Sequence, residues 1–355
     1  MNGKPVLYRD AKTVLNAKNE AFREKLLCDG LIYNPGDACA YSCSFCYVAS
    51  LQRYLAPPIL NAYESQTGKA LKFEGAVIRR RNATELLRAQ LLKSNGQRRY
   101  PEDDDNRVVY SSTTVDVAAN MELLRETAEM CNLILEHTGW QVRLLSKSNL
   151  LHKLVADGMI PERHQHRLIF GFSTGTIDDR VARAFEKGTA LVSKRIDSLH
   201  WLQDNGFRTF GMICPSLPQG DYDRFSREVC EAIRVDKCEH VWAEPINVRG
   251  DSFVRTLSAL RGKGLHAEAD RLASVLGPGK GEAWENYSRA TFLAHTRHIP
   301  AEKLRFLQYV NDGTASWWTA QRKLGAILLG KKAKELGLTS SGRSVHADAK
   351  PIRTL

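Results

Sequence analysis

The chain lacks the long apolar stretches that membrane insertion and secretion require. The apolar run at residues 324–330 is far too short to cross a bilayer, and residues 1–5 carry no hydrophobic part of a signal peptide. Cysteine is scarce too. Eight cysteines in 355 residues are too few to form a disulfide scaffold. We therefore expect a protein of the reducing cytoplasm that does not contact a membrane.

The sequence also contains no internal repeat and no low-complexity tract. Hydrophobic residues make up 43% of the chain, enough for a sizeable core, which argues against global disorder. The net charge of +11 favours a nucleic acid or another polyanion as a partner, since Lys and Arg neutralise phosphates. A basic surface that only keeps the protein soluble is the alternative.

What the sequence does contain is a cluster of three cysteines, Cys39, Cys43 and Cys46, at C-x3-C-x2-C spacing. They follow a short apolar run at 31–33 and a turn at 34–37. Three thiolates on one loop suit an iron–sulfur cluster, because its iron prefers soft ligands. A [4Fe–4S] cluster has four irons, so three cysteines leave one iron open for a non-protein ligand. A tetrahedral zinc site with a fourth ligand elsewhere is the alternative.

The other cysteines show no ligand spacing, so we expect no second cluster. Cys131 falls on the apolar stripe of a helix predicted at 120–137 and is expected in the core. Cys28 is expected to be a buried, neutral thiol. Cys230 and Cys238 are eight residues apart, which is not a recognised metal clip.

Strands and helices alternate through the middle of the chain. The strands are predicted at 30–34, 107–111, 141–145, 167–172, 208–214 and 240–244. Such alternation implies parallel strands joined by right-handed crossovers. We therefore predict an α/β fold, a partial (β/α)6 TIM-like barrel over residues 30–250 with the cluster loop at 37–47. Reactive groups are expected at the C-terminal ends of the strands.

The flanking regions are predicted to be helical. Residues 1–29 form an N-terminal helical extension with a helix at 13–27. Residues 251–355 form an α-rich region that covers the barrel mouth, with helices near 253–276, 282–297 and 318–336 and a loose tail from about residue 339.

The cysteine spacing, with the aromatic Tyr47 directly after the third cysteine, resembles the signature of the radical S-adenosylmethionine (SAM) superfamily. The resemblance implies that SAM binds the open iron through its amino and carboxylate groups. It also implies that the reduced cluster cleaves SAM to release a carbon radical. An electron donor such as flavodoxin or ferredoxin would reduce the cluster.

Within that superfamily, short stretches at the strand ends fall in the order seen in spore photoproduct lyase-like proteins, over about residues 30–250. These stretches are 39–47, 111–116, 145–148, 172–173 and 215–218. In that family the second strand ends in Thr-x-Asp and the third in Thr-Lys-Ser or similar. Here these resemble Thr114-Val-Asp116 and Ser146-Lys147-Ser148.

One departure concerns the hydrogen-atom donor. Spore photoproduct lyase has a cysteine near its Thr-x-Asp, which returns a hydrogen atom to the product radical. This chain has Ser111, Ser112 and Thr113 there, and hydroxyl O–H bonds are too strong for that role. Repair of thymine dimers by the same route is therefore doubtful. Cys214, at the end of the fifth strand, could replace the donor, or it is simply a buried thiol.

The resemblance also suggests residues that bind SAM. Phe45 or Tyr47 would pack on the adenine, unless these rings only pack around the cluster. Ser173, with Lys194 or Arg195, would bind the ribose and carboxylate, because a cation forms strong hydrogen bonds to a carboxylate. The alternative for both cations is a surface position.

Four further polar residues lie at strand ends. Glu244 and Asn247, just past the sixth strand, could bind polar groups of SAM or substrate. Asp116 and Lys147 are expected to orient the substrate or to pair with each other.

Two basic or aromatic stretches are ambiguous. Arg79, Arg80 and Arg81 could bind phosphates, although a solvated helix start is the commoner arrangement. Trp317 and Trp318, with lysines after them, could stack on a flipped base, but packing of the last helices is favoured.

Three functions remain open from the sequence. The first is a radical SAM enzyme of lyase or transferase type acting on a nucleic acid or nucleotide. The second is the same chemistry on a small metabolite or peptide, with SAM as cofactor or consumed co-substrate. The third is a non-catalytic metal protein that binds nucleic acid.

Overall fold

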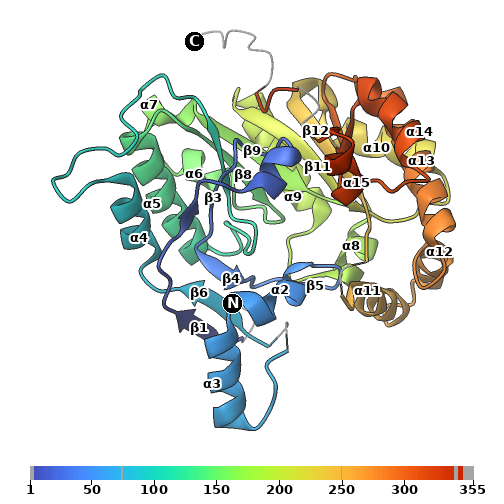
Figure 1. Cartoon of the computed structure of the whole chain (residues 1–355), viewed down its shortest axis with the longest axis horizontal. Helices are drawn as coiled ribbons and strands as arrows, with labels where there is room; N and C mark the ends of the chain where they lie inside the picture. The colour runs from blue at the N-terminus through green and yellow to red at the C-terminus, as the bar shows by residue number, and fades with distance from the viewer. Residues whose placement is uncertain (1–3, 73–74, 249, 340–342, 347–355) are drawn as a thin grey trace.

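The computed structural model describes residues 4–72, 75–248, 250–339 and 343–346, and one large sheet runs through them (Figure 1). The strand order across this sheet is β14-β13-β12-β11-β9-β8-β7-β3-β2. All neighbours are parallel except β2 (Leu15–Asn16), which pairs antiparallel with β3 at the edge. The parallel strands are β3 (Leu31–Tyr33), β7 (Val108–Ser111), β8 (Gln141–Ser146), β9 (Leu168–Ser173), β11 (Arg208–Ser216), β12 (Cys238–Pro245), β13 (Leu304–Tyr309) and β14 (Ala326–Leu329).

The predicted α/β class is confirmed. The six predicted strands correspond to β3, β7, β8, β9, β11 and β12, and helices lie between consecutive strands. Among the described strands, β14 pairs only with β13, so the sheet stays open as in a partial barrel. The carboxyl ends of all eight parallel strands therefore lie along one edge.

One face of the sheet packs against a layer of amphipathic helices. The core between them contains buried Leu124 and Cys131 of α5, Leu199 of α9 and Val229 of α10. The predicted core position of Cys131 is confirmed. This layer comprises α4 (Ala83–Leu91), α5 (Met121–His137), α6 (Lys153–Ala156), α9 (Val192–Asp204), α10 (Tyr222–Ile233) and α13 (Gly281–His298).

The opposite face is covered by the N-terminal segment. Leu26, Leu27 and Cys28 pack there with Trp242 of β12. Arg143, fully buried on β8, donates to the carbonyls of Leu26 (3.4 Å) and Leu27 (2.6 Å). The burial of Cys28 raises its pKa to about 12, so it is the neutral thiol that was predicted.

The helix predicted at 13–27 is wrong for most of its length. Residues 15–16 form β2, and the helix is only α1 (Glu20–Glu24). Asn19 is the N-cap of α1, because its side chain accepts a hydrogen bond from the Phe22 N–H (3.0 Å). The helix therefore begins at Glu20 and not at residue 13. Leu26, at φ 56°, lies in the left-handed region beyond its end.

The helix predicted at 318–336 is also wrong. It is divided into α14 (Ala315–Gln321), β14 and α15 (Lys331–Glu335). Gly325, at φ +113°, ends the helical stretch, and the apolar run after it is buried throughout, as in a parallel strand that is covered on both faces. β13 was not predicted either. Helices do occupy the other two predicted stretches, as α11 (Ser252–Arg261) with α12 (His266–Val275), and as α13.

Two small sheets hold the cysteine loop. One contains β1 (Val6–Arg9), β6 (Val77–Arg80) and β4 (Gly36–Ala38), and the other pairs β5 (Ser42–Cys43) with β10 (Glu186–Lys187). The remaining helices are α2 (Val48–Leu55), α3 (Pro57–Thr67), α7 (Glu162–Gln165) and α8 (Asp179–Phe185), with short 3-10 turns at Val235–Lys237 and Arg322–Leu324. Figure 1 shows α3 projecting from the first small sheet. Within the described residues, no helix has the length and apolar character needed to span a bilayer.

Candidate metal centre

The start of the cysteine loop is fixed by a buried carboxylate. Asp37 on β4 is fully buried and forms ion pairs with Arg9 and Arg80 (2.9 Å). The neighbouring arginines are also paired, Arg79 with Glu126 and Arg81 with Asp10. These three arginines are therefore engaged by carboxylates of the chain itself, which leaves the phosphate-binding alternative without support.

The middle of the loop is anchored to the C-terminal end of α8. On β5, Cys43 lies opposite Glu186 of β10. Ser44 donates to the carbonyl of Phe185 (3.2 Å) and to the hydroxyl of Thr256 on α11 (3.0 Å). The loop that begins at β3 thus reaches across the strand ends to the elements that follow β9.

The three thiols of this loop are withdrawn from solvent, Cys43 fully and Cys39 and Cys46 partly. Burial is the main cause of their raised pKa values, and the charges of the neighbouring thiols raise those of Cys39 and Cys43 further. The Sγ of Cys39 accepts hydrogen bonds from the backbone N–H of Tyr41 (3.4 Å) and of Asp116 (3.3 Å). Backbone N–H groups at the start of α2 and the cations of Lys147 and Arg255 lower the pKa of Cys46 against its burial.

This donor set fits an anionic iron–sulfur cluster. Hydrogen bonds to the sulfurs and nearby cations are the means by which proteins stabilise such clusters. Within the described residues, no three His, Cys, Asp or Glu side chains are close enough to bind a single metal ion.

A buried network of three charges lies beside the thiols. Glu186, 1% exposed, accepts from Lys147 Nζ on one oxygen (2.6 Å) and from Arg195 on the other (2.6 Å). Burial raises the pKa of Glu186, but the two cations outweigh it and hold that pKa below its ordinary value. The sequence did not single out Glu186, because a glutamate between a helix and Lys187 looks like a surface residue.

The predicted SAM-binding cations lie in contrasting places. Arg195 is 1% exposed and also donates to the carbonyls of Ser173 (2.8 Å) and Ala190 (3.0 Å), so the chain itself uses its donors. Lys194 points to solvent and pairs with Asp197 (2.9 Å). The structure therefore brings Arg195 to the site as a structural cation and leaves Lys194 outside it.

Ser173 and Phe45 lie at the site, but the side chains of both already contact other residues of the chain. The hydroxyl of Ser173 donates to the carbonyl of Cys214 (2.9 Å). The ring of Phe45 packs on Phe185, with 5.5 Å between centroids, and Lys147 Nζ lies 5.4 Å from its centre. These contacts of Phe45 correspond to the alternative named above, in which its ring packs around the cysteine loop.

Asp116 is a hub at the ends of β7 and β8. Its carboxylate accepts from the Ser146 hydroxyl (2.7 Å) and from the backbone N–H groups of Lys147 (2.7 Å) and Ala118 (2.9 Å). Burial raises the pKa of this carboxyl. The expected pairing of Asp116 with the Lys147 ammonium is wrong, because that ammonium binds Glu186.

A second polar group lies at the ends of β11 and β12. The Sγ of Cys214 is 3.8 Å from the Oε2 of Glu244, and Lys25 Nζ is 3.7 Å from the same oxygen. Burial, followed by the charge of Glu244, raises the pKa of Cys214 to about 12. Tyr47, 39% exposed, donates from its hydroxyl to the carbonyl of Thr113. Lys25 was missed because it comes from the N-terminal segment, far away in sequence.

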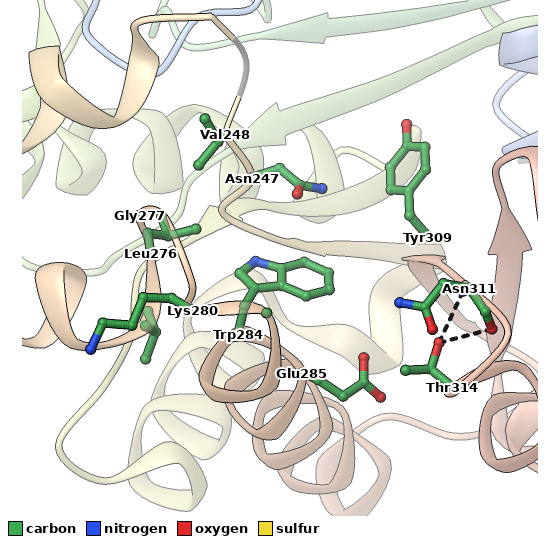
Figure 2. A pocket seen from close by; sticks show the side chains of 12 residues that line it. Asn247, Val248, Leu276, Gly277, Lys280, Trp284, Glu285, Tyr309, Asn311 and Thr314 are labelled. Atoms are coloured by element: carbon green, nitrogen blue, oxygen red, sulfur yellow. Dashed lines mark hydrogen bonds between the residues drawn. The ribbon is translucent and has the colours of Figure 1, made fainter.

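Asn247 lies in a cavity of its own. The cavity is about 290 Å³ and is bounded by the loop after β12, the start of α13 and the loop after β13 (Figure 2). Its lining includes no residue of the cysteine loop. Trp318, by contrast, is fully buried against Phe292 and Phe306, so it packs the last helices as favoured.

No family model matches the chain, and no curated protein matches it. Among solved structures, a variant of spore photoproduct lyase is similar at a TM-score of 0.49 and 11% identity, covering 82% of this chain and 78% of that one. Another variant, with bound AdoMet and dinucleoside spore photoproduct, has a TM-score of 0.46 and 14% identity, covering 77% and 79%. Streptococcus suis SuiB, bound to precursor peptide SuiA, has a TM-score of 0.37 and 11% identity, covering 72% and 50%. The first two are named for the family that the sequence resembles. Their TM-scores are below 0.5, so the case for this chain depends on its own residues.

Proposed function

We propose that this chain is a radical SAM enzyme. In this proposal Cys39, Cys43 and Cys46 bind three irons of a [4Fe–4S] cluster, and SAM binds the fourth. The observation that carries the proposal is the loop with three cysteines at C-x3-C-x2-C spacing at the carboxyl edge of a parallel sheet, where backbone N–H groups donate to the Sγ of Cys39. When bound and reduced, cluster and SAM supply a carbon-centred radical.

The chain's own residues hold this centre in place. Glu186 fixes Lys147 beside the thiols, and Asp116 fixes the backbone that carries Lys147. We assign both carboxylates as positioning residues, because each is occupied by hydrogen bonds from the protein. Tyr47 and Ser173 line the same edge, and the carboxylate of Glu244 contacts Cys214. The catalytic unit in this proposal is the predicted barrel region at 30–250, whose parallel sheet β13 and β14 extend.

Cys214 is the proposed hydrogen-atom donor. Hydrogen-atom transfer needs a thiol and not a thiolate, and a pKa of about 12 keeps Cys214 protonated at neutral pH. In the step, the S–H bond breaks, a C–H bond forms on the substrate, and a thiyl radical remains on sulfur. One electron from the flavodoxin or ferredoxin donor and one proton restore the thiol. The reducing cytoplasm is the compartment in which this chemistry is expected.

A nucleic acid or nucleotide is the proposed substrate class. The net charge of +11 supports it, since phosphate contacts dominate affinity for nucleic acids. A small metabolite or peptide is the competing substrate class, and it predicts no binding to nucleic acid. Binding to short DNA and RNA at low and high salt separates the two classes, because phosphate neutralisation weakens steeply with salt.

SAM cleavage tests the enzyme itself. The protein is reconstituted with iron and sulfide without oxygen, reduced with dithionite and given SAM. We expect 5′-deoxyadenosine, and its loss in Cys43→Ala. Methylthioadenosine would instead show that SAM is a consumed co-substrate whose other fragment is transferred. An intact SAM pool, with and without nucleic acid, contradicts the proposal.

A further inference from the structure

The cavity beside Asn247 has a lining that the proposed SAM chemistry does not use. Its residues come from the loop after β12, the segment leading into α13, α13 itself, and β13 with the loop after it. At about 290 Å³ it lies just below the range of about 300–1,000 Å³ for small-molecule sites. It therefore has room for one compact ring system and not for a long chain.

An aromatic ring in a fixed orientation forms part of the lining. The indole N–H of Trp284 donates to the carbonyl of Ile246 (2.8 Å), and this bond holds the ring in place before any ligand arrives. Figure 2 shows this indole between the side chains of Asn247 and Glu285, with Tyr309 and Asn311 toward β13. A preoriented aromatic face stacks on flat rings at little entropic cost.

Two amides supply hydrogen bonds next to that ring. Asn247 lines the cavity, and its side-chain amide carries an oxygen acceptor and an NH2 donor. Asn311 accepts from the Gly313 N–H (3.0 Å) through Oδ1, which orients its NH2 group. An amide presents a donor and an acceptor side by side, which matches the edge of a heterocycle such as adenine.

The charged residues of the lining offer no buried partner to an ionic ligand. The carboxylate of Glu285 is already bound by Trp318 Nε1 (2.7 Å) and Arg289 Nε (2.7 Å). The remaining charged residue of the lining, Lys280, is exposed and extends away from Tyr309 and Asn311 in Figure 2. A neutral ring with polar edges is what such a lining accommodates.

The cavity is also close to the proposed chemistry. Asn247 follows Glu244 by three residues, which span at most about 11 Å of chain. Glu244 lies 3.8 Å from the Cys214 thiol. A ligand held at Asn247 would therefore place its remainder within reach of the thiol.

We infer that this cavity binds one neutral planar heterocycle of the substrate, stacked on Trp284 and hydrogen-bonded by the amides of Asn247 and Asn311. This inference rests on the proposed function and defines its substrate as a molecule that carries such a ring. The same ring chemistry occurs in the adenine of SAM, so the test must separate the two sources.

The test measures binding to the purified full-length protein by calorimetry without oxygen. The probes are the four 2′-deoxynucleosides and nicotinamide, with 2-deoxyribose as the ring-free control and SAM as the second source. We expect at least one ring-bearing probe to bind and 2-deoxyribose not to bind. Trp284→Ala should weaken that probe about 5- to 150-fold, the usual range for base stacking. Asn247→Leu should weaken it about 2- to 13-fold, as loss of a hydrogen bond does.

Two further variants keep the result interpretable. Trp284→Phe retains a ring and should bind more tightly than Trp284→Ala, which also covers the case in which the alanine variant folds poorly. Leu293→Ala, on the same helix but 42% exposed and outside the lining, should bind as the wild type does. The affinity for SAM should stay unchanged in all of them.

The outcomes distinguish this inference from the proposed function. If no ring-bearing probe binds while SAM is still cleaved, the cavity inference is overturned and the enzyme assignment stands. If SAM affinity falls in step with the probe in Asn247→Leu, the cavity holds the adenine of SAM, which also overturns the inference. If a probe binds with the expected variant pattern but SAM is never cleaved, the cavity assignment holds and the proposed function fails.

Discussion

The ion pairs of Glu186 offer a quantitative test of how the cysteine loop is held. Replacing Glu186 by Gln keeps the shape of the side chain and removes its charge. Lys147 and Arg195 then remain buried as cations, with side chains only 14% and 1% exposed. Breaking a buried pair by removing one partner costs about 3–5 kcal/mol, because the remaining charge is desolvated without compensation. We therefore expect the free energy of unfolding to fall by about that amount.

The assay is urea denaturation of the protein without iron, followed by circular dichroism at neutral pH. A matched control is Asp197→Asn, which breaks an exposed pair with Lys194 whose side chains are 64% and 60% exposed. Surface pairs contribute about 0–1 kcal/mol, so this control should change stability little. Glu186 of β10 pairs with Cys43 of β5, a proposed cluster ligand. The Glu186→Gln variant should therefore also bind less iron after reconstitution. A loss below 1 kcal/mol in Glu186→Gln would refute the reasoning.

Three further predictions concern other parts of the molecule. Cys214→Ala should leave SAM cleavage intact but let the substrate radical collect hydrogen from elsewhere, so that side products rise; an unchanged product distribution would exclude the proposed donor. Arg143→Met should release residues 26–27 from the sheet, and limited proteolysis should cut there faster than in wild type, whereas equal rates would show that the hydrogen bonds to these carbonyls do not hold the segment. Burial lowers the pKa of His295 to about 3, below its unfolded value of about 6.5, so the unfolded state takes up its proton first and stability falls as the pH drops below 6.5. His295→Gln should lessen that fall by up to about 1.4 kcal/mol per pH unit in urea titrations, and identical pH profiles would contradict the assignment.

The parts of the fold that could be predicted are those with a local signal. The cysteine spacing and the apolar strands at 31–33 and 168–173 can each be recognised from a few consecutive residues. The run at 326–329 is short and apolar, and such runs fit a helix or a strand equally well. Pairing with β13 makes it a strand, and that pairing cannot be read from the run itself. The N-terminal helix was overextended for a related reason, since pairing with β3 takes residues 15–16.

The site could be predicted only where its chemistry is local. Lys194 and Arg195 are neighbours in sequence but about 100° apart on α9, so one faces solvent and the other the core; the sequence alone gave no way to choose. Glu186 and Lys25 gain their roles from partners far along the chain, and no single-sequence pattern marks such residues.

The most direct test of the central claim is electron paramagnetic resonance of the reduced, reconstituted protein, recorded with and without SAM. We predict about four irons per chain and a signal of a reduced [4Fe–4S] cluster whose g-values shift when SAM is added, because SAM binds the iron that has no cysteine. Cys39→Ala, Cys43→Ala and Cys46→Ala should each lose the signal. A cluster signal that SAM leaves unchanged, or a protein that binds one zinc ion and no cluster, would contradict the account.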